Sequence, residues 1–519
     1  MVFGAGGDAW KGRKPLMHEK AWAGGELLML AASHGGVNLG FGLQYALLTP
    51  FVMELGVPKH MASFLWLGGP LTGMLVQPLV GRLSDSYSGS LARFGRRRPF
   101  LIVAMLVTLL AQILVGNCVD LGVFLGDKKD ESLRARAAAV FTLGFWLLDA
   151  GSNGIIVTSR ALLIDVVPES QMLQAFSAGT LTSGLGLALG YLVGGLSLSH
   201  LPGLRHVVVT EACGAAGGCA DVRVAFMVAS AVLASSTCCT VIIGHEMPAK
   251  TTDGEAHEEV QQLLCQTQEP KSLVAVICDD LTVLAVFITS SLTWFGWIAT
   301  QMFQSHFVAE EIYGGSPDPR HPSNKLYVEG MHAASLALVV NALLMAASTM
   351  SFEVVRQRLG DKGLWTLGLQ TTAILMALSL VVQAMKSKVA AWIWLAAMGP
   401  TYAVQLTLPY TILSTRAPEN LQGQLQGYLN IAVCLPQLVL SLCGGQLLAW
   451  AGTDTGLFAL GAVANVSAVA VWQLLPPNDK KPSQPLLQDP TCREIRNSCA
   501  MARKRGMDSV TAKGDMLDV

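Results

Sequence analysis

Long apolar stretches recur along the whole chain and leave it few ways to fold. A helix needs roughly 20 apolar residues to cross the hydrocarbon core of a bilayer, and twelve stretches of this sequence reach that length. Hydrophobic residues make up 52% of the 519 and charged residues only 14%, whereas soluble domains carry about 25% charged residues. The sequence therefore predicts an all-α integral membrane protein with twelve transmembrane helices.

The predicted spans form two groups of six. They cover residues 26–53, 61–83, 100–118, 137–163, 171–196, 224–244, 281–306, 333–353, 363–385, 390–413, 424–450 and 456–475. We expect an N-terminal segment (1–25), a six-helix bundle (26–244), a polar linker (245–280), a second six-helix bundle (281–475) and a tail (476–519). The tail is rich in Lys, Pro, Gln and Arg and poor in aromatic residues, which predicts disorder.

The basic residues indicate how the chain is oriented. Cytosolic loops hold an excess of Lys and Arg, and most of the 35 basic residues face the cytosol if the N-terminus lies there. Both termini are then expected to be cytosolic. The first 25 residues lack an apolar run, so we expect no cleavable signal peptide. A net charge of −1 gives no reason to expect nucleic-acid binding.

Two of the eleven cysteines flank a Gly-rich hexapeptide between the fifth and sixth spans. In the predicted orientation, Cys213 and Cys219 face a non-cytosolic compartment, where oxidation is permitted. A disulfide between them and two free thiols are both compatible with this position.

An acidic residue lies at the centre of the fourth span, in the run FWLLDAGSNGIIVTSRALL. This residue, Asp149, is the one acid at such a depth. A carboxylate there costs about 2.5–3.5 kcal/mol on insertion scales, and such groups usually carry protons or bind polar solutes. The alternative is a structural carboxylate whose neighbours satisfy it.

The spacing around this acid places further polar groups on one helix face. Asn153 follows Asp149 by one turn. Arg160 follows by eleven residues, which returns to within roughly 20° of the same face and about 16 Å closer to the cytosol. Arg160 is either part of a coupling pathway or a basic anchor at the helix end.

No pattern typical of an enzyme appears in the sequence. It contains no metal-ligand cluster, nucleophile elbow or phosphate-binding Gly loop, so we expect no enzymatic activity, no metal and no cofactor. Each half instead carries a short basic, Gly-containing turn, GRLSDSYSGSLARFGRRRP after the second span and VVRQRLGDKGLW after the eighth. Two similar six-helix halves are typical of transporters with a site near the bilayer midplane.

Several long runs carry a family resemblance. They are GVNLGFGLQYALLTPFVMELGVP in the first span, FGRRRPF after the second, WLLDAGSNGIIVTSRALLIDV in the fourth, LTWFGW in the seventh and NIAVCLPQLVLSLCGG in the eleventh. Through these runs the chain, from about Glu26 to Trp472, resembles the plant sucrose/proton symporters of the glycoside-pentoside-hexuronide group. That group belongs to the major facilitator superfamily.

The resemblance implies roles for individual residues. Asp149 aligns with the carboxylate that couples protons and binds sugar, Arg160 with an arginine implicated in coupling, and Asn153 with a polar residue beside the sugar. Further sugar contacts are expected from Gln44, Asn38, Trp294 and Trp297. The aromatic residues Phe41, Tyr45, Trp146 and Tyr402 are weaker candidates, because most aromatics in such bundles pack or anchor. Asp85, Arg96 and Arg97 align with a cytosolic latch between the halves.

The sequence departs from the family at the end of the seventh span, where it reads FQSHFVAEEIYGG. Gln304 and His306 replace two acids, and Glu310 replaces an arginine. The resemblance predicts a monomeric symporter of protons and sucrose or a related glucoside, in the plasma membrane rather than the vacuolar membrane. An uncoupled or exporting transporter of another polar metabolite and a membrane sugar sensor remain as alternatives.

Overall fold

The computed structural model describes residues 21–57, 67–87, 94–128, 134–196, 209–213, 218–246, 277, 280–317, 321–416 and 421–474. The predicted tail lies outside these residues, as do all but a few residues of the N-terminal segment and the central linker. The described helices belong to one compact unit, formed by Met1–Ala249 and Leu281–Leu475.

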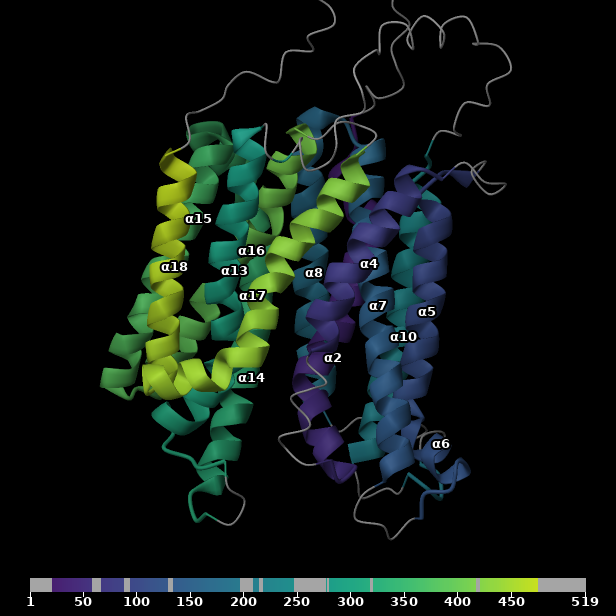
Figure 1. The fold of residues 1–519 in the computed structure, drawn as a ribbon, viewed down its shortest axis with the longest axis vertical. Helices are drawn as coiled ribbons and strands as arrows, with labels where there is room; N and C mark the ends of the chain where they lie inside the picture. Colours follow the sequence, from purple (N-terminus) through teal and green to yellow (C-terminus); the bar gives the residue numbers. More distant parts are fainter. Residues whose placement is uncertain are drawn as a thin grey trace, which may run out of the picture. The chain divides into compact units, whose positions relative to one another are not determined.

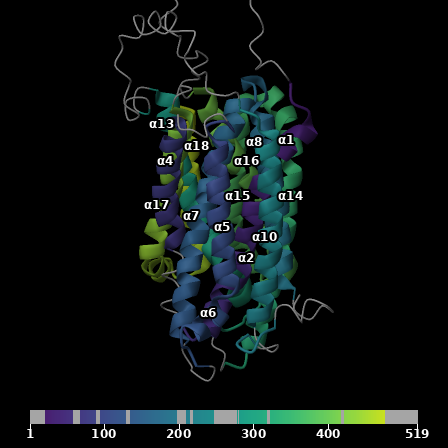
Figure 2. The same ribbon diagram turned by 90° about the vertical axis from the view of Figure 1, so that its right-hand side faces the viewer.

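Helices make up the regular structure of the described residues, which confirms the predicted all-α fold. The first half contains α1 (Gly24–Leu30), α2 (Ala32–Glu54), α4 (Gly68–Asp85), α5 (Arg98–Gly116), α6 (Cys118–Phe124), α7 (Ala135–Val166), η3 (Glu169–Gln171), α8 (Met172–Gly195) and α10 (Gly218–Ile243). The second half contains α13 (Leu281–Phe307), η5 (Val308–Ile312), α14 (Asn324–Ser348), η6 (Thr349–Ser351), α15 (Phe352–Met385), α16 (Lys388–Arg416), α17 (Gln422–Ala451) and α18 (Asp454–Leu474). Figures 1 and 2 show the long helices running roughly side by side.

Each of the twelve predicted spans overlaps a long helix, and residues 61–66 of the second span lie outside the described residues. Among the described residues, nine segments are long and apolar enough to cross a membrane, and one of them, 324–385, holds both α14 and α15. Helices α2 and α4, rich in Gly and polar residues, complete the twelve. The first span is interrupted at Ala31, between α1 and α2. Helix α14 begins nine residues before the predicted start of its span, because its first turns contain Lys325 and Glu329 and do not register as apolar.

Two ends of the helical unit serve as landmarks below. The Arg97 end, at the top of Figure 1, holds the C-terminus of α4 and the N-terminus of α5. The Cys213 end, at the bottom, holds α6 and a disulfide between Cys213 and Cys219. Near this disulfide, Arg223 at the start of α10 forms an ion pair with Asp120 of α6. The sequence had left open whether the two cysteines pair.

Glycines allow the helices of the first half to approach closely. A Cβ atom on Gly186 of α8 would overlap the backbone of Gly35 in α2, and one on Gly190 would overlap Leu39 and Gly42. Such contacts between small residues are a main source of packing energy between membrane helices, because lipid supplies no hydrophobic drive for helices to associate.

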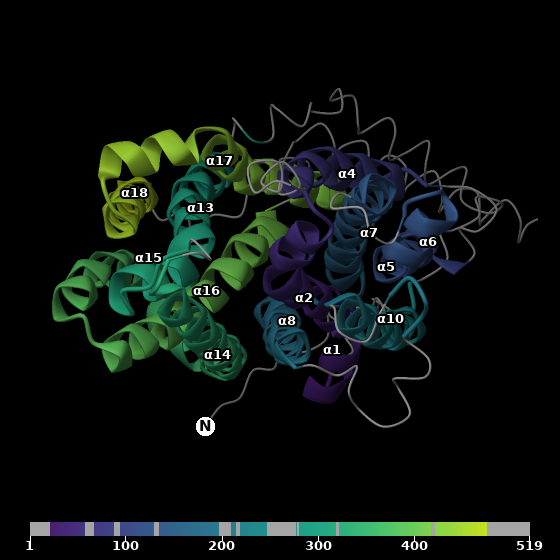
Figure 3. The same ribbon diagram turned by 90° about the horizontal axis from the view of Figure 1, so that it is seen from below.

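Helix α4 has two faces that differ in side-chain size. Leu75, Leu79 and Leu83 are all at least half exposed and recur every four residues, as expected of a face in contact with lipid. The other face carries Gly69, Gly73, Gln77, Gly81 and Asp85, also every four residues. We call this second set the α4 small face. In Figures 2 and 3, α4 lies beside α17, a helix of the other half.

Gly186→Ala tests the close packing of α2 on α8. The added methyl group meets backbone atoms that cannot rotate away, so we expect the unfolding free energy to fall by about 1–3 kcal/mol. Gly195→Ala in the same helix is the matched control, because a Cβ there meets no atom within 4 Å. The measurement is thermal unfolding of the purified protein in detergent, and equal melting temperatures for both variants would contradict the proposed packing.

Candidate functional site

Asp149 lies where the two halves meet. Its side chain is only 3% exposed, and a Cβ on Gly69 of α4 would stand 3.6 Å from Oδ2 of Asp149 and 3.7 Å from Nε2 of Gln437. Gln437 belongs to α17, in the second half. The absence of a side chain at Gly69 thus leaves space between the acid on α7 and the amide on α17.

The amide of Gln44, on α2, also faces the Asp149 carboxylate. The Gln44 side chain is a hydrogen-bond partner of the carboxylate, and its buried Nε2 makes no other hydrogen bond to the described residues. An amide N–H₂ group carries two N–H bonds, so one of them remains for a polar ligand that enters beside Asp149.

Asn153 is held within the first half. Its Nδ2 donates to the backbone oxygen of Asp149 at 2.9 Å, and its Oδ1 accepts a hydrogen bond of 2.7 Å from Nε2 of Gln77, on α4. Both Asp149 and Asn153 are buried. Asn153 thus links the acid's helix to the α4 small face, and its side-chain groups are already used.

Aromatic residues from both halves surround the same region. Trp294 and Trp297 of α13 contact the ring of Tyr402 of α16, with centroids 6.0 and 4.8 Å apart. Tyr402 and Asp149 both lie within electrostatic range of Tyr45 of α2. Tyr45 is 51% exposed. Nε1 of Trp297 is buried and finds no acceptor among the described residues.

Arg160 packs against the second half. Its guanidinium lies 3.7 Å from the ring centre of Tyr410, on α16, and that ring stacks on Phe176 of α8 at 6.3 Å. Thr180 of α8 and Thr407 of α16 form a hydrogen bond of 2.8 Å nearby along the same helices. This placement differs from that of a basic anchor exposed at a helix end.

The predicted latch residues gather at the Arg97 end. Arg97 is fully buried and forms an ion pair with Asp85 at 2.5 Å. Asp165 of α7 pairs with Arg96 and with Arg97, each at 2.8 Å. Asp85 also accepts hydrogen bonds from the backbone N–H groups of Gly423 (3.1 Å) and Gln424 (2.9 Å), in the first turn of α17. A carboxylate is stabilised at a helix N-terminus, so Asp85 links the two halves.

Between Asp85 and Asp149, the α4 small face packs directly on α17. A Cβ on Gly81 would overlap the carbonyl of Gly423, one on Gly427 would approach the carbonyl of Gln77 to 2.6 Å, and one on Gly73 would approach Sγ of Cys434 to 2.7 Å. We call this contact the α4–α17 seam. The sequence analysis did not identify it, although glycines spaced by four residues were a usable signal.

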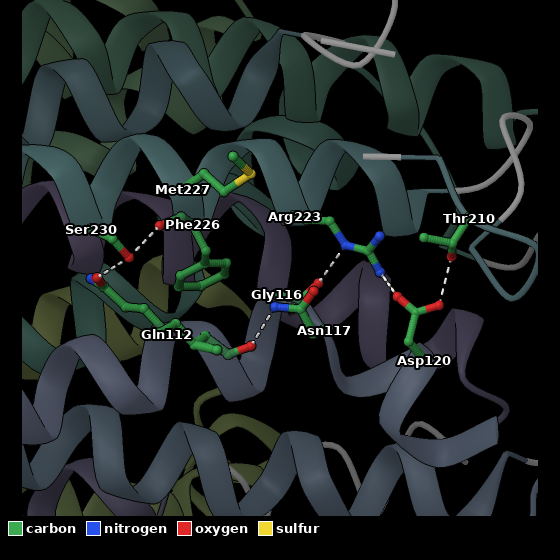
Figure 4. Close-up of a pocket in the computed structure, with 10 residues that line it drawn as sticks. Gln112, Gly116, Asn117, Asp120, Thr210, Arg223, Phe226, Met227 and Ser230 are labelled. Atoms are coloured by element: carbon green, nitrogen blue, oxygen red, sulfur yellow. Dashed lines mark hydrogen bonds and ion pairs between the residues drawn. The ribbon is translucent and has the colours of Figure 1, made fainter. Parts of the chain in front are cut away.

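Other predicted residues lie apart from Asp149. Asn38 donates to the backbone oxygen of His34 and to Oγ of Ser183, within the α2–α8 contact. Gln304, His306 and Glu310 lie at the far end of α13 or just beyond it. A cavity of about 380 Å³ between α5 and α10 contains none of the predicted site residues. Figure 4 shows that Arg223, Asp120 and Gln112 line it.

The chain resembles known transporters in sequence. Residues 30–441 match the family model of the Major Facilitator Superfamily. Sucrose transport protein SUT2 of Oryza sativa subsp. indica is 32% identical over 464 residues, which cover 85% of this chain and 90% of that protein. Sucrose transport protein SUC4 of Arabidopsis thaliana is 30% identical over 467 residues, covering 84% of this chain and 87% of that protein.

Solved structures of other transporters share the fold. The human organic anion transporter MFSD10 (TETRAN) aligns with a TM-score of 0.59 at 14% identity, covering 87% of this chain and all of that one. A variant of the E. coli fucose:proton symporter FucP aligns with a TM-score of 0.53 at 13% identity, covering 87% of this chain and 97% of that one.

The family model covers most of the described helices, and the residues placed around Asp149 above all fall within it. The protein is a multi-pass integral membrane protein and a transporter by family. The chain belongs to the Major Facilitator Superfamily and, within it, to the family of the plant sucrose transport proteins.

Proposed function

We propose that this protein is a proton-coupled symporter of sucrose or a related glucoside, with Asp149 as the group that binds both the proton and the sugar. One observation carries the proposal. The buried Asp149 carboxylate lies at the junction of the two halves, hydrogen-bonded to Gln44 of the first half and across the space at Gly69 from the Gln437 amide of the second half.

The chemistry of these groups suits a neutral polyol. A protonated carboxyl can donate a hydrogen bond to a sugar hydroxyl, and a carboxylate can only accept one. The Gln44 amide and the Trp297 indole can each donate to a hydroxyl oxygen, and the rings of Trp297 and Tyr402 offer apolar faces to the sugar's C–H groups. Sugar binding therefore can supply an acceptor to the Trp297 indole, which has none among the described residues.

Coupling follows if the proton and the sugar each favour the binding of the other. An ionised carboxylate is expensive in the bilayer interior, so the neutral form is favoured when water is displaced by sugar. One proton that crosses a potential of 100 mV supplies about 2.3 kcal/mol. With one proton per sugar, this free energy supports an accumulation of about 50-fold.

Alternating access requires the two halves, residues 26–244 and 281–475, to rock against each other around Asp149. In this structure the α4–α17 seam, the Asp85 hydrogen bonds to α17 and the Arg160–Tyr410 contact join the halves on the side of the Arg97 end. We propose that this end faces the cytosol, that both termini are cytosolic, and that the protein acts as a monomer in the plasma membrane.

Asp149→Asn is expected to abolish accumulation, because the amide keeps the size of the side chain but does not bind a proton. In proteoliposomes with an imposed pH gradient and potential, labelled sucrose should reach only its equilibrium distribution instead of about 50-fold excess. Glu329→Gln is the control, because Glu329 is an exposed acid of the second half that pairs with Lys388 and lies away from Asp149. Concentrative uptake by the Asp149→Asn protein would refute the assigned role.

Trp297→Phe removes the indole N–H and keeps an aromatic ring. We expect KM for sucrose to rise about 5- to 10-fold, the equivalent of one hydrogen bond of about 1–1.5 kcal/mol. Trp394→Phe is the matched control, because Nε1 of Trp394 donates to the backbone oxygen of Leu375 at 2.7 Å. That variant should lose stability and keep its KM. An unchanged KM in Trp297→Phe would exclude the indole as a sugar contact.

Asp85→Asn removes the charge that joins Arg97 to the first turn of α17. Breaking one partner of a buried ion pair costs about 3–5 kcal/mol, so the Arg97 end should open more often. The measurement is labelling of Gln426→Cys by a membrane-impermeant thiol reagent, with the other cysteines outside the disulfide removed. Gln426 is fully buried here, and we expect labelling to increase at least several-fold. Equal labelling of the cysteine at position 426 with and without the Asp85→Asn substitution would contradict a latch.

A further inference from the structure

Three acidic or basic side chains meet at the Cys213 end of the second half, away from Asp149. His306 is in the last turn of α13, and both of its ring nitrogens face carboxylates. Nδ1 lies 2.7 Å from Oδ2 of Asp454, the first residue of α18. Nε2 lies 2.7 Å from Oε2 of Glu310, in η5. We call His306, Glu310 and Asp454 the outer triad.

The two contacts together require an extra proton. A neutral imidazole has one N–H group, so it can donate to one carboxylate and turns a lone pair toward the other. Both contacts are favourable only if the imidazole is doubly protonated or one carboxyl group carries the proton instead. In either case the outer triad holds one proton more than a neutral imidazole and two carboxylates.

Burial makes the loss of this proton costly. The Asp454 side chain is only 3% exposed, whereas those of His306 and Glu310 are 35% and 45% exposed. Without the imidazolium, Asp454 becomes a buried charge that lacks a cationic partner in this contact, an arrangement that proteins tolerate poorly. Glu310 can instead turn toward solvent.

Side chains of η5, α14 and α15 surround the outer triad. Glu311 accepts the backbone N–H of Asp454 at 3.0 Å and a hydrogen bond from Gln383 of α15 at 2.5 Å. Tyr327 of α14 meets the His306 ring edge-on at 6.0 Å. The titratable groups that the described residues place near His306 include the acids Asp454, Glu310 and Glu311 and the phenol of Tyr327.

We propose that the outer triad is a second proton-binding site, distinct from Asp149, and that its proton fastens the outer end of α13 to α18. An imidazole changes charge between about pH 5 and pH 8, so the joint should be closed at acid pH and weaker at neutral to alkaline pH. The extra proton is inferred only from the contacts of the two His306 ring nitrogens with Asp454 and Glu310. The location on the extracellular side rests on the orientation proposed above.

The position of the outer triad indicates what it can influence. His306 follows Trp297 by nine residues on the same helix, about 13 Å along its axis. The π-helical turn Val308–Ile312 follows directly, and such turns are frequent at functional sites. Proton binding at the outer triad can therefore fix the end of the helix that carries Trp294 and Trp297, which gives the protein a sensor of external acidity.

The test is thermal unfolding of the purified protein at pH 5.5 and pH 8.0, without sugar and without a gradient. We expect the melting temperature of the wild type to be higher at pH 5.5 by about 2 °C or more. His306→Gln should narrow this difference. Glu310→Gln, at a more exposed position, should narrow it too, because the Gln N–H₂ group can donate to Nε2 of a neutral imidazole, so this contact no longer requires the extra proton.

Two controls separate this proposal from the transport mechanism. Glu329→Gln removes an exposed acid paired with Lys388 in the same half and should leave the pH difference unchanged. Asp149 is a second buried acid whose protonation also favours the folded protein at acid pH, so the comparison is repeated in an Asp149→Asn background, where His306→Gln should still narrow the pH difference. If the His306→Gln protein does not fold, the difference in melting temperature between pH 5.5 and pH 8.0 in the Glu310→Gln protein tests the proposal. A pH difference that equals the wild-type value in the folded variants of the outer triad would overturn the proposal.

Discussion

The contact of α4 with α17 places the acid of one half against the other half. Gly81 and Gly427 bring the two backbones so close that an added Cβ would overlap the carbonyl of the opposite helix. From the Asp85 hydrogen bonds, residue numbers fall along α4 and rise along α17, so the seam ends at Gly69, beside Asp149 and Gln437. A shift of the halves at the Arg97 end therefore changes the surroundings of the buried carboxylate.

Polar side chains connect the α4–α17 seam to α7, the helix that carries Asp149. Gln77 lies on the α4 small face and donates to Asn153, which in turn donates to the backbone of Asp149. Arg160, farther along α7, contacts Tyr410 of the opposite half. The acid's helix is thus held by polar contacts that reach both halves, and we propose that protonation of Asp149 acts on the relative position of the halves through them.

The sequence predicted the helices well, because a span depends on local composition, and it singled out Asp149, which the structure places buried in α7. Twenty apolar residues predict a span, and one Asp among them stands out by its cost. The residues of other helices that contact these groups could not be predicted in the same way. Tyr410 and Gly427 are separated from Arg160 and Gln77 by hundreds of residues, and no periodicity within one helix reveals which helix packs on it. The same limit applies to His306 and Asp454, which only the fold brings together.

The central claim is that proton binding and sugar binding meet at Asp149. Calorimetry of sucrose binding to the purified protein, in buffers with different enthalpies of ionisation, measures the protons exchanged per sugar bound. We predict net proton uptake at a pH where Asp149 is partly ionised, and none in Asp149→Asn. Sucrose binding without proton exchange across the pH range, or proton uptake that persists in Asp149→Asn, would contradict the account.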